Sequence, residues 1–158
     1  MRKIKLTQNK YALVDDNDFE ELNKFKWHAL KSENTFYPLR KIWDKNTKKQ
    51  TVIMMHRVIM ETPKGKETDH IDRNALNNQR SNLRIVTHSQ NQMNKGMSKN
   101  NTSGFKGVMW DKSSKKWQAK IRKNNKQIYL GLFETKEKAS EAYIEACKKY
   151  HGDFANYS

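Results

Sequence analysis

Short runs of alternating apolar and polar residues dominate the first 55 residues of the chain. A period of two is typical of strands, and the expected strands are Ile4–Leu6, Ala12–Val14, Trp27–Leu30, Phe36–Ile42 and Val52–Met55. Asp16 is a suitable N-cap for one short helix. The apolar face of that helix comprises Phe19, Leu22 and Phe25. The pattern therefore predicts a strand-rich N-terminal region, residues 1–55.

The next region, residues 56–93, predicts a mixture of short elements. In chain order these are a helix at His56–Glu61, a strand at Glu67–Ile71, a polar loop at Asp72–Ser81 and a strand at Leu83–Val86. Pro63 and Gly65 end the first helix. Thr87 is placed to cap a second helix that begins at His88.

A polar linker and a third region complete the chain. The linker, residues 94–102, is rich in Gly, Ser, Asn and Lys and has no apolar run to bury. In the region 103–158 the expected strands are Gly107–Asp111, Trp117–Lys123 and Lys126–Phe133, joined by turns at Lys112–Lys116 and Asn124–Asn125. Thr135 caps a final helix, whose packing face comprises Ala139, Ala142, Tyr143, Ala146 and Tyr150.

One seven-residue segment recurs in the chain. Residues 43–49, which read WDKNTKK, resemble residues 110–116, which read WDKSSKK. A duplicated sheet would produce such a repeat. Two hairpins that share the same turn chemistry would also produce it, and we prefer this interpretation.

Positive charge is the strongest feature of the composition. The chain has 32 Lys and Arg against 17 Asp and Glu, a formal net charge of +15. The charge is unevenly placed, because residues 94–127 hold ten Lys or Arg and a single acid, Asp111. A polyanion is therefore the expected partner.

The composition also excludes several classes. Cys147 is the single cysteine, so neither an intrachain disulfide nor a cysteine-based zinc cluster is possible. No apolar run approaches the length needed to span a membrane, and the first residues lack the apolar core of a signal peptide. We expect a cytoplasmic protein with no membrane contact.

Four polar residues carry the candidate chemistry: Asp69, His70, Asn82 and Asn91. The predicted strand, loop, strand and helix can fold back so that these residues converge. Carboxylate and amide oxygens are hard ligands that suit Mg²⁺ or Mn²⁺. A neutral imidazole beside such an ion can take a proton from an attacking water. The set therefore fits hydrolysis of a phosphodiester.

Residues 56–93 resemble the HNH endonucleases, above all the phage and intron-encoded homing enzymes of that family. The matching segments are His56–Met60, Pro63, Gly65, Asp69–Asp72, Asn74, Leu76–Asn78, Ser81–Arg84 and Gln90–Asn91. The resemblance implies a ββα-metal fold with His70 as the general base. It also implies one Mg²⁺ or Mn²⁺ ion on Asp69 and Asn91, and an Asn82 that ties the loop and orients His70.

Other residues of this region are open to more than one interpretation. His56 could support the site or face a phosphate, and a buried structural histidine is at least as good an explanation. His88 is a rival metal ligand that we rank below Asn91, because the family spacing favours the asparagine. Arg57 and Arg84 are candidates for contact with the DNA backbone, or are simply solvated.

Residues 103–158 resemble the AP2 DNA-binding domain. The matching segments are Ser103–Val108, Trp117–Arg122, Tyr129–Phe133, Thr135, Glu137, Ala139, Ala142 and Tyr143. In that family a three-stranded sheet lies in the major groove. Period-two geometry places Lys120 and Arg122 on one face of the middle strand, and Lys106, Gln127 and Tyr129 are further candidates for the same surface. Met109 and Asp111 stand where plant members often carry Arg, so base specificity does not transfer.

These features predict an α+β protein of two small modules: a nuclease module, and a three-stranded antiparallel sheet with one helix. The expected function is site-specific, metal-dependent cleavage of double-stranded DNA by a monomer, and the resemblance to the HNH endonucleases implies 5′-phosphate and 3′-hydroxyl ends. We also expect residues 1–55 to contact DNA. One alternative is a non-catalytic regulator that binds DNA through the AP2-like module. A second is an RNA-processing nuclease, which a sheet suited to the major groove of DNA argues against.

Overall fold

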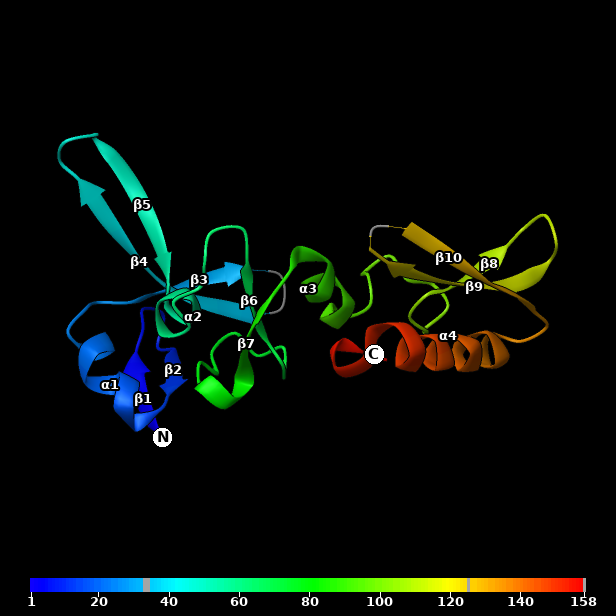
Figure 1. The fold of residues 1–158 in the computed structure, drawn as a ribbon, viewed down its shortest axis with the longest axis horizontal. Coiled ribbons are helices and arrows are strands. Elements are labelled where there is room, and N and C mark those ends of the chain that lie inside the picture. Colours follow the sequence, from blue (N-terminus) through cyan, green and yellow to red (C-terminus); the bar gives the residue numbers. More distant parts are fainter. Residues whose placement is uncertain (33–34, 125, 158) are drawn as a thin grey trace. The chain divides into compact units, whose positions relative to one another are not determined.

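The computed structural model describes residues 1–32, 35–124 and 126–157. Its contacts divide the chain into two compact units, Met1–Thr87 and His88–Ser158. Each unit combines small antiparallel sheets or hairpins with short helices (Figure 1). The mixed α and β content agrees with the fold class predicted from the sequence.

The first unit begins with two small sheets. Strand β1 (Arg2–Lys5) pairs with β2 (Tyr11–Val14), and β3 (His28–Ser32), β4 (Thr35–Asp44) and β5 (Lys49–Met54) form an antiparallel sheet in that order. The buried core takes residues from both sheets and from the segment that follows them. It comprises Ile4, Leu6, Ala12, Val14, Leu22, Trp27, Ala29, Met55, Ile59 and Leu83.

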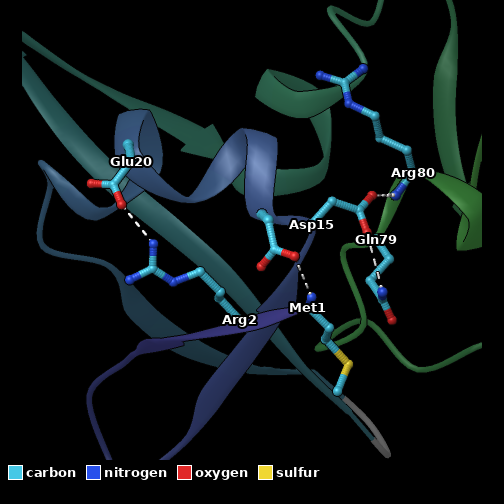
Figure 2. Close-up of polar contacts among 7 residues, drawn as sticks. Met1, Arg2, Asp15, Glu20, Gln79 and Arg80 are labelled. Carbon is cyan, nitrogen blue, oxygen red and sulfur yellow. Dashed lines mark hydrogen bonds and ion pairs between the residues drawn. The ribbon is translucent and has the colours of Figure 1, made fainter.

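The helix between these sheets departs from the expected capping. Helix α1 spans Asp16–Asn23, so Asp15, not Asp16, holds the N-cap position, and it makes no side-chain capping bond. Figure 2 shows the reason: the Asp15 carboxylate accepts hydrogen bonds from Gln79 Nε2 (3.2 Å) and Arg80 N (2.8 Å). Phe25 lies beyond the helix and is 45% exposed. The predicted cap is therefore used to fasten a distant loop.

The remainder of the first unit holds the predicted strand, loop and strand. Helix α2 (Met55–Ile59) leads to β6 (Glu67–His70), a 3₁₀ turn η1 (Arg80–Asn82) and β7 (Leu83–Val86), which pairs antiparallel with β6. The connecting loop is fixed to β2, since Leu13 N donates to Leu76 O and Asn78 N donates to Leu13 O, both at 2.8 Å. Residues 1–55 therefore share one core with the segment that carries the candidate site.

The second unit is a sheet covered by a helix. Strands β8 (Val108–Asp111), β9 (Lys116–Lys123) and β10 (Lys126–Phe133) form an antiparallel sheet in the order β10-β9-β8. Helix α4 (Lys136–His151) packs on all three strands, and Thr135 Oγ1 accepts a hydrogen bond from Lys138 N as its cap. The expected turn at Asn124–Asn125 lies in part outside the described residues, because Asn125 is not among them.

Gly107 shows how tightly α4 packs on this sheet. Its φ is +73°, and a Cβ atom there would lie 2.1 Å from the Tyr143 ring and 2.7 Å from Lys120 O. A residue without a side chain is required for such an approach. The buried face of α4 comprises Ala139, Ser140, Tyr143, Ala146, Cys147 and His151.

Helix α3 (His88–Asn94) belongs to the second unit, together with the short 3₁₀ turn η2 (Gly152–Phe154) that follows α4. Asn156 Nδ2 donates to Asn94 O (2.7 Å), and Lys106 Nζ donates to Met93 O (3.1 Å). The division of the chain therefore falls after Thr87. This division comes before the predicted linker at 94–102, and that linker stays a prediction.

Candidate functional site

Asp69 and His70 occupy the carboxyl-terminal end of β6. Both are buried, each with 6% of its surface exposed. Asp69 lies opposite Arg84 in the register of β6 and β7. The Nε and Nη2 atoms of Arg84 both lie 2.8 Å from Asp69 Oδ2. A two-nitrogen contact of this kind fixes the carboxylate more strictly than a lysine could.

The His70 imidazole is held by an amide and by two rings. Its Nε2 lies 3.4 Å from Asn78 Oδ1, and Asn78 Nδ2 donates to Ala75 O (3.0 Å), which turns the amide oxygen toward the ring. The rings of His56 and Tyr37 meet it edge to face, at centroid distances of 5.1 and 6.3 Å. The side chain therefore has a defined orientation inside a mostly buried cluster.

Burial sets the charge of His70. Desolvation lowers its pKa from the usual 6.5, and the contact with Asn78 and the charges of Asp72 and Asp69 oppose that change only in part. The imidazole is consequently neutral at neutral pH. A neutral ring is the form that can accept a proton from water.

His56, on α2, is the buried neighbour of His70. Desolvation lowers its pKa to about 3, and the charges of His70 and Arg57 act in the same direction. Its Nδ1 atom has no hydrogen-bond partner within the described residues. Two of the interpretations of this histidine are thus compatible, since it is buried and also packs against the candidate base.

We expect His56 to make the protein less stable in acid. The unfolded chain protonates this residue below about pH 6.5, while the folded protein keeps it neutral until about pH 3. Its contribution to stability is therefore complete above pH 6.5. It is lost as the pH falls, by up to about 1.4 kcal/mol per pH unit. Urea unfolding between pH 7 and pH 4, followed by tryptophan fluorescence to which the buried Trp27 of the same unit contributes, measures the slope.

His56→Leu is the comparison for this measurement, because it removes the titrating group and leaves an apolar side chain of similar size. The variant should show a shallower loss of stability over the same pH range. Equal slopes for the two proteins would contradict the assigned pKa of His56.

Asn82 ties the site loop together. Its Nδ2 donates to Asp72 Oδ1 (2.9 Å) and to Asn77 O (2.8 Å), and its Oδ1 accepts from Asp72 N (3.0 Å). Its backbone oxygen accepts from Ile71 N (2.9 Å). These bonds close the loop directly after His70. The predicted catalytic role of Asn82, the orientation of His70, stays a prediction.

Asn91 lies on α3, in the second unit, and is half-buried. Its pairing with Asp69 at one ion stays a prediction. The donor chemistry suits that pairing, because one carboxylate and one amide oxygen fit a hydrated divalent ion that takes its remaining ligands from water and phosphate. The described part of the chain has no cluster of three His, Cys, Asp or Glu side chains that could hold a metal.

Two arginines predicted to contact DNA make internal bonds. Arg84 holds Asp69, and Arg57 donates to Lys66 O (3.0 Å) and Thr62 O (3.4 Å), which fastens the loop after α2. Contact of either residue with DNA stays a prediction. The sequence did not assign a partner to Arg84, since the pairing depends on the register of two strands separated by a long loop. Asn78 was part of the recognised motif but had no role there.

The sheet of the second unit brings together four of the five residues in the range 103–158 that are predicted to contact DNA. Arg122 pairs with Gln127, and Lys120 pairs with Tyr129, so all four side chains share one face. The alternate residues of β9, Ala119 and Ile121, are buried. A cavity of about 490 Å³ borders this face and is lined in part by His88, Gln92, Lys120, Arg122 and Gln127.

Lys106, the fifth predicted residue, lines the same cavity but makes internal bonds. Its ammonium group donates to the backbone oxygens of Met93, Lys95 and Asn156. The lysine therefore holds α3 and the chain end to the sheet. Its contact with DNA stays a prediction.

Comparison with known proteins identifies two families in the chain. The family model described as HNH endonuclease matches residues 54–93, and the AP2 domain model matches residues 103–153. An uncharacterized HNH endonuclease of Acanthamoeba polyphaga mimivirus is 33% identical over 147 residues, which cover 92% of this chain and 73% of the relative. Protein 3.8 of Escherichia phage T7 is 35% identical over 95 residues, which cover 60% and 78%. The chain belongs to the HNH endonuclease family and also carries an AP2 domain.

The AP2 domain has relatives of another kind. An ethylene-responsive transcription factor of Arabidopsis thaliana is 41% identical over 51 residues, 32% of this chain but only 11% of that protein. The likeness therefore concerns the domain alone. No solved structure matches the chain. No helix within the described residues has the length and apolar character needed to cross a membrane.

Proposed function

We propose that this protein cleaves double-stranded DNA by metal-dependent hydrolysis of a phosphodiester bond. The observation that carries the proposal is the pair at the end of β6, where a buried neutral His70 adjoins a carboxylate fixed by Arg84. The membership of the HNH endonuclease family supports the same reaction.

Each residue of the site has a separate task in this proposal. His70 takes a proton from the attacking water. Asn78 orients the His70 ring, and Asn82 keeps the following loop closed. Asp69 and Asn91 would hold one Mg²⁺ or Mn²⁺ ion. When bound, such an ion stabilises the negative charge that develops on the phosphate and on the leaving oxygen.

The AP2 domain supplies the binding energy in this proposal. Lys120 and Arg122 neutralise phosphates, while Gln127 and Tyr129 lie close enough on the same face to meet base edges. Linking two DNA-binding modules raises the effective concentration of the second, so that modest contacts give a long recognition site. We propose a homing-type, site-specific enzyme that acts as a monomer.

A plasmid assay tests the proposed function. We expect the protein to nick or linearise supercoiled plasmids at low salt with Mg²⁺. The plasmids carry a library of DNA segments that are candidates for the cleavage site. EDTA should abolish the cutting, because Asp69 and Asn91 then hold no ion. Tight, sequence-selective binding without cutting in Mg²⁺ or Mn²⁺ would contradict the proposal and favour a regulator.

A further inference from the structure

The β4–β5 hairpin extends out of the first unit beyond Leu39 and Met54. Figure 1 shows it leading away from β3 and from the helices beside it. Every residue from 41 to 52 is exposed. This stretch adds nothing to the core. Burial therefore does not offset the conformational entropy that is lost when an exposed ribbon is ordered. Such a ribbon suits a partner outside the chain.

Cations and apolar side chains occur together on this exposed segment. Four lysines stand against a single acid, Asp44, whose oxygens accept hydrogen bonds within the turn. Trp43 is 58% exposed and Val52 50% exposed. The register pairs Lys41 with Val52 and Trp43 with Gln50, which places the tryptophan and a lysine on one face. The four lysines are Lys41, Lys45, Lys48 and Lys49.

The end of this hairpin repeats the end of the β8–β9 hairpin in the AP2 domain. Asp44 accepts from Asn46 N (2.9 Å) and Thr47 Oγ1 (2.8 Å), and Asp111 accepts from Ser113 N (3.2 Å) and Ser114 Oγ (2.8 Å). The preferred interpretation of the sequence repeat, two hairpins with one turn chemistry, is confirmed.

The likeness extends past the hydrogen bonds to the side chains that the turns display. Lys48 and Lys115 both have a φ of 51°, and the tryptophans that precede the turns are 58% and 44% exposed. Three lysines flank each turn at corresponding positions. In the second unit Trp110 pairs with Trp117 and lies on the face of the buried Ala119, opposite to Lys120 and Arg122, so the likeness concerns the two turns and not the face predicted to contact DNA.

We propose that the β4–β5 hairpin is a third DNA-contacting element, separate from the nuclease site and from the AP2 sheet. Its lysines bind phosphates, and Trp43 lies against the sugar and base edges of the groove. A two-stranded ribbon has the width that the major groove of duplex DNA accepts. Residues 41–52 lie outside both matched family segments. The choice of duplex DNA as ligand rests on the proposed function.

Charge removal in the full-length protein tests this proposal. The hairpin variant is Lys41→Gln with Lys45→Gln, which removes the lysine on the face of Trp43 and one lysine of the turn, and the matched control is Lys138→Gln with Lys148→Gln, two exposed lysines of α4. Each variant loses the same charge and keeps its core residues. Binding to a labelled duplex of random sequence is measured by fluorescence anisotropy over a series of salt concentrations, with EDTA present so that no cutting occurs.

The hairpin variant should bind the duplex roughly tenfold more weakly, and the slope of log affinity against log salt should fall by about 2, one contact for each lysine. The control should bind like the wild type. Equal binding by the hairpin variant and the control overturns the proposal. A loss that appears with a random duplex RNA and not with DNA also overturns it, in favour of an RNA partner.

The plasmid assay in Mg²⁺ separates this proposal from the proposed function. If the wild type does not cut but the hairpin variant alone binds weakly, the nuclease assignment fails and the hairpin contact stands. If the wild type cuts and both variants bind equally, the nuclease stands and the hairpin contact fails.

Discussion

Replacement of His70 by alanine should lower the rate of DNA cleavage by roughly 10²–10⁴-fold, the usual contribution of a general base. The imidazole is buried, neutral and oriented by Asn78, so water at the site loses its proton acceptor when the ring is removed. DNA affinity should change little, because the charged surfaces that bind phosphates are untouched. Single-turnover cleavage of a plasmid and a gel-shift assay in EDTA measure the two quantities.

His28→Ala is the matched control for this experiment. His28 is an exposed histidine on β3 of the same unit, and no site is built on it. Its removal should leave cleavage unchanged. If His70→Ala cleaves as fast as the His28→Ala variant, another residue is the base.

Replacement of Arg84 by methionine should destabilise the protein by about 3–5 kcal/mol, because it removes the guanidinium group that pairs with the buried Asp69 carboxylate. Cleavage should fall as well, since the carboxylate loses its fixed orientation. Urea unfolding and plasmid cleavage measure these effects. The double variant Asp69→Asn with Arg84→Met should regain much of the stability but none of the activity, because it removes the buried negative charge and also the proposed metal ligand.

The single variant Arg84→Met distinguishes an ion pair with Asp69 from contact of Arg84 with the DNA backbone. An arginine that contacts the DNA backbone would, when removed, lower the affinity and the salt dependence and leave the stability unchanged. The ion pair predicts the opposite pattern. A stable Arg84→Met protein with weaker DNA binding would therefore restore the role expected from the sequence.

Periodicity predicted the elements well where one face of an element is buried. Ala119 and Ile121 alternate with Lys120 and Arg122, and this alternation alone placed β9 and its two faces. It was less informative at element ends. Asp15 and Asp16 are equivalent as cap signals, and the hydrogen bonds that occupy the Asp15 carboxylate come from Gln79 and Arg80, more than 60 residues away.

The site could be predicted only as far as local motifs reach. Asp69, His70 and Asn82 were found as a motif, and the loop-closing bonds of Asn82 follow from its short distance along the chain to Asp72. The Asp69–Arg84 pair depends on strand register, which the 12-residue segment between β6 and β7 does not reveal.

The internal role of Lys106 could not be predicted from the sequence. Lys106 is a cation in a basic segment, as expected of a residue that contacts DNA. Its ammonium group nevertheless donates hydrogen bonds to three backbone oxygens. These hydrogen bonds help to place α3 with the AP2 sheet, whereas the sequence assigned that helix to the nuclease region.

The central claim is that the pair at the end of β6 makes this protein a metal-dependent DNA nuclease. The most direct measurement is strand breakage of supercoiled plasmid in Mg²⁺ by the wild type and by His70→Ala. The two proteins are compared at concentrations that bind the same fraction of the DNA. Our account predicts nicked or linear products from the wild type, none in EDTA and almost none from His70→Ala. Binding by both proteins with no strand breakage by the wild type, in either Mg²⁺ or Mn²⁺, would contradict it.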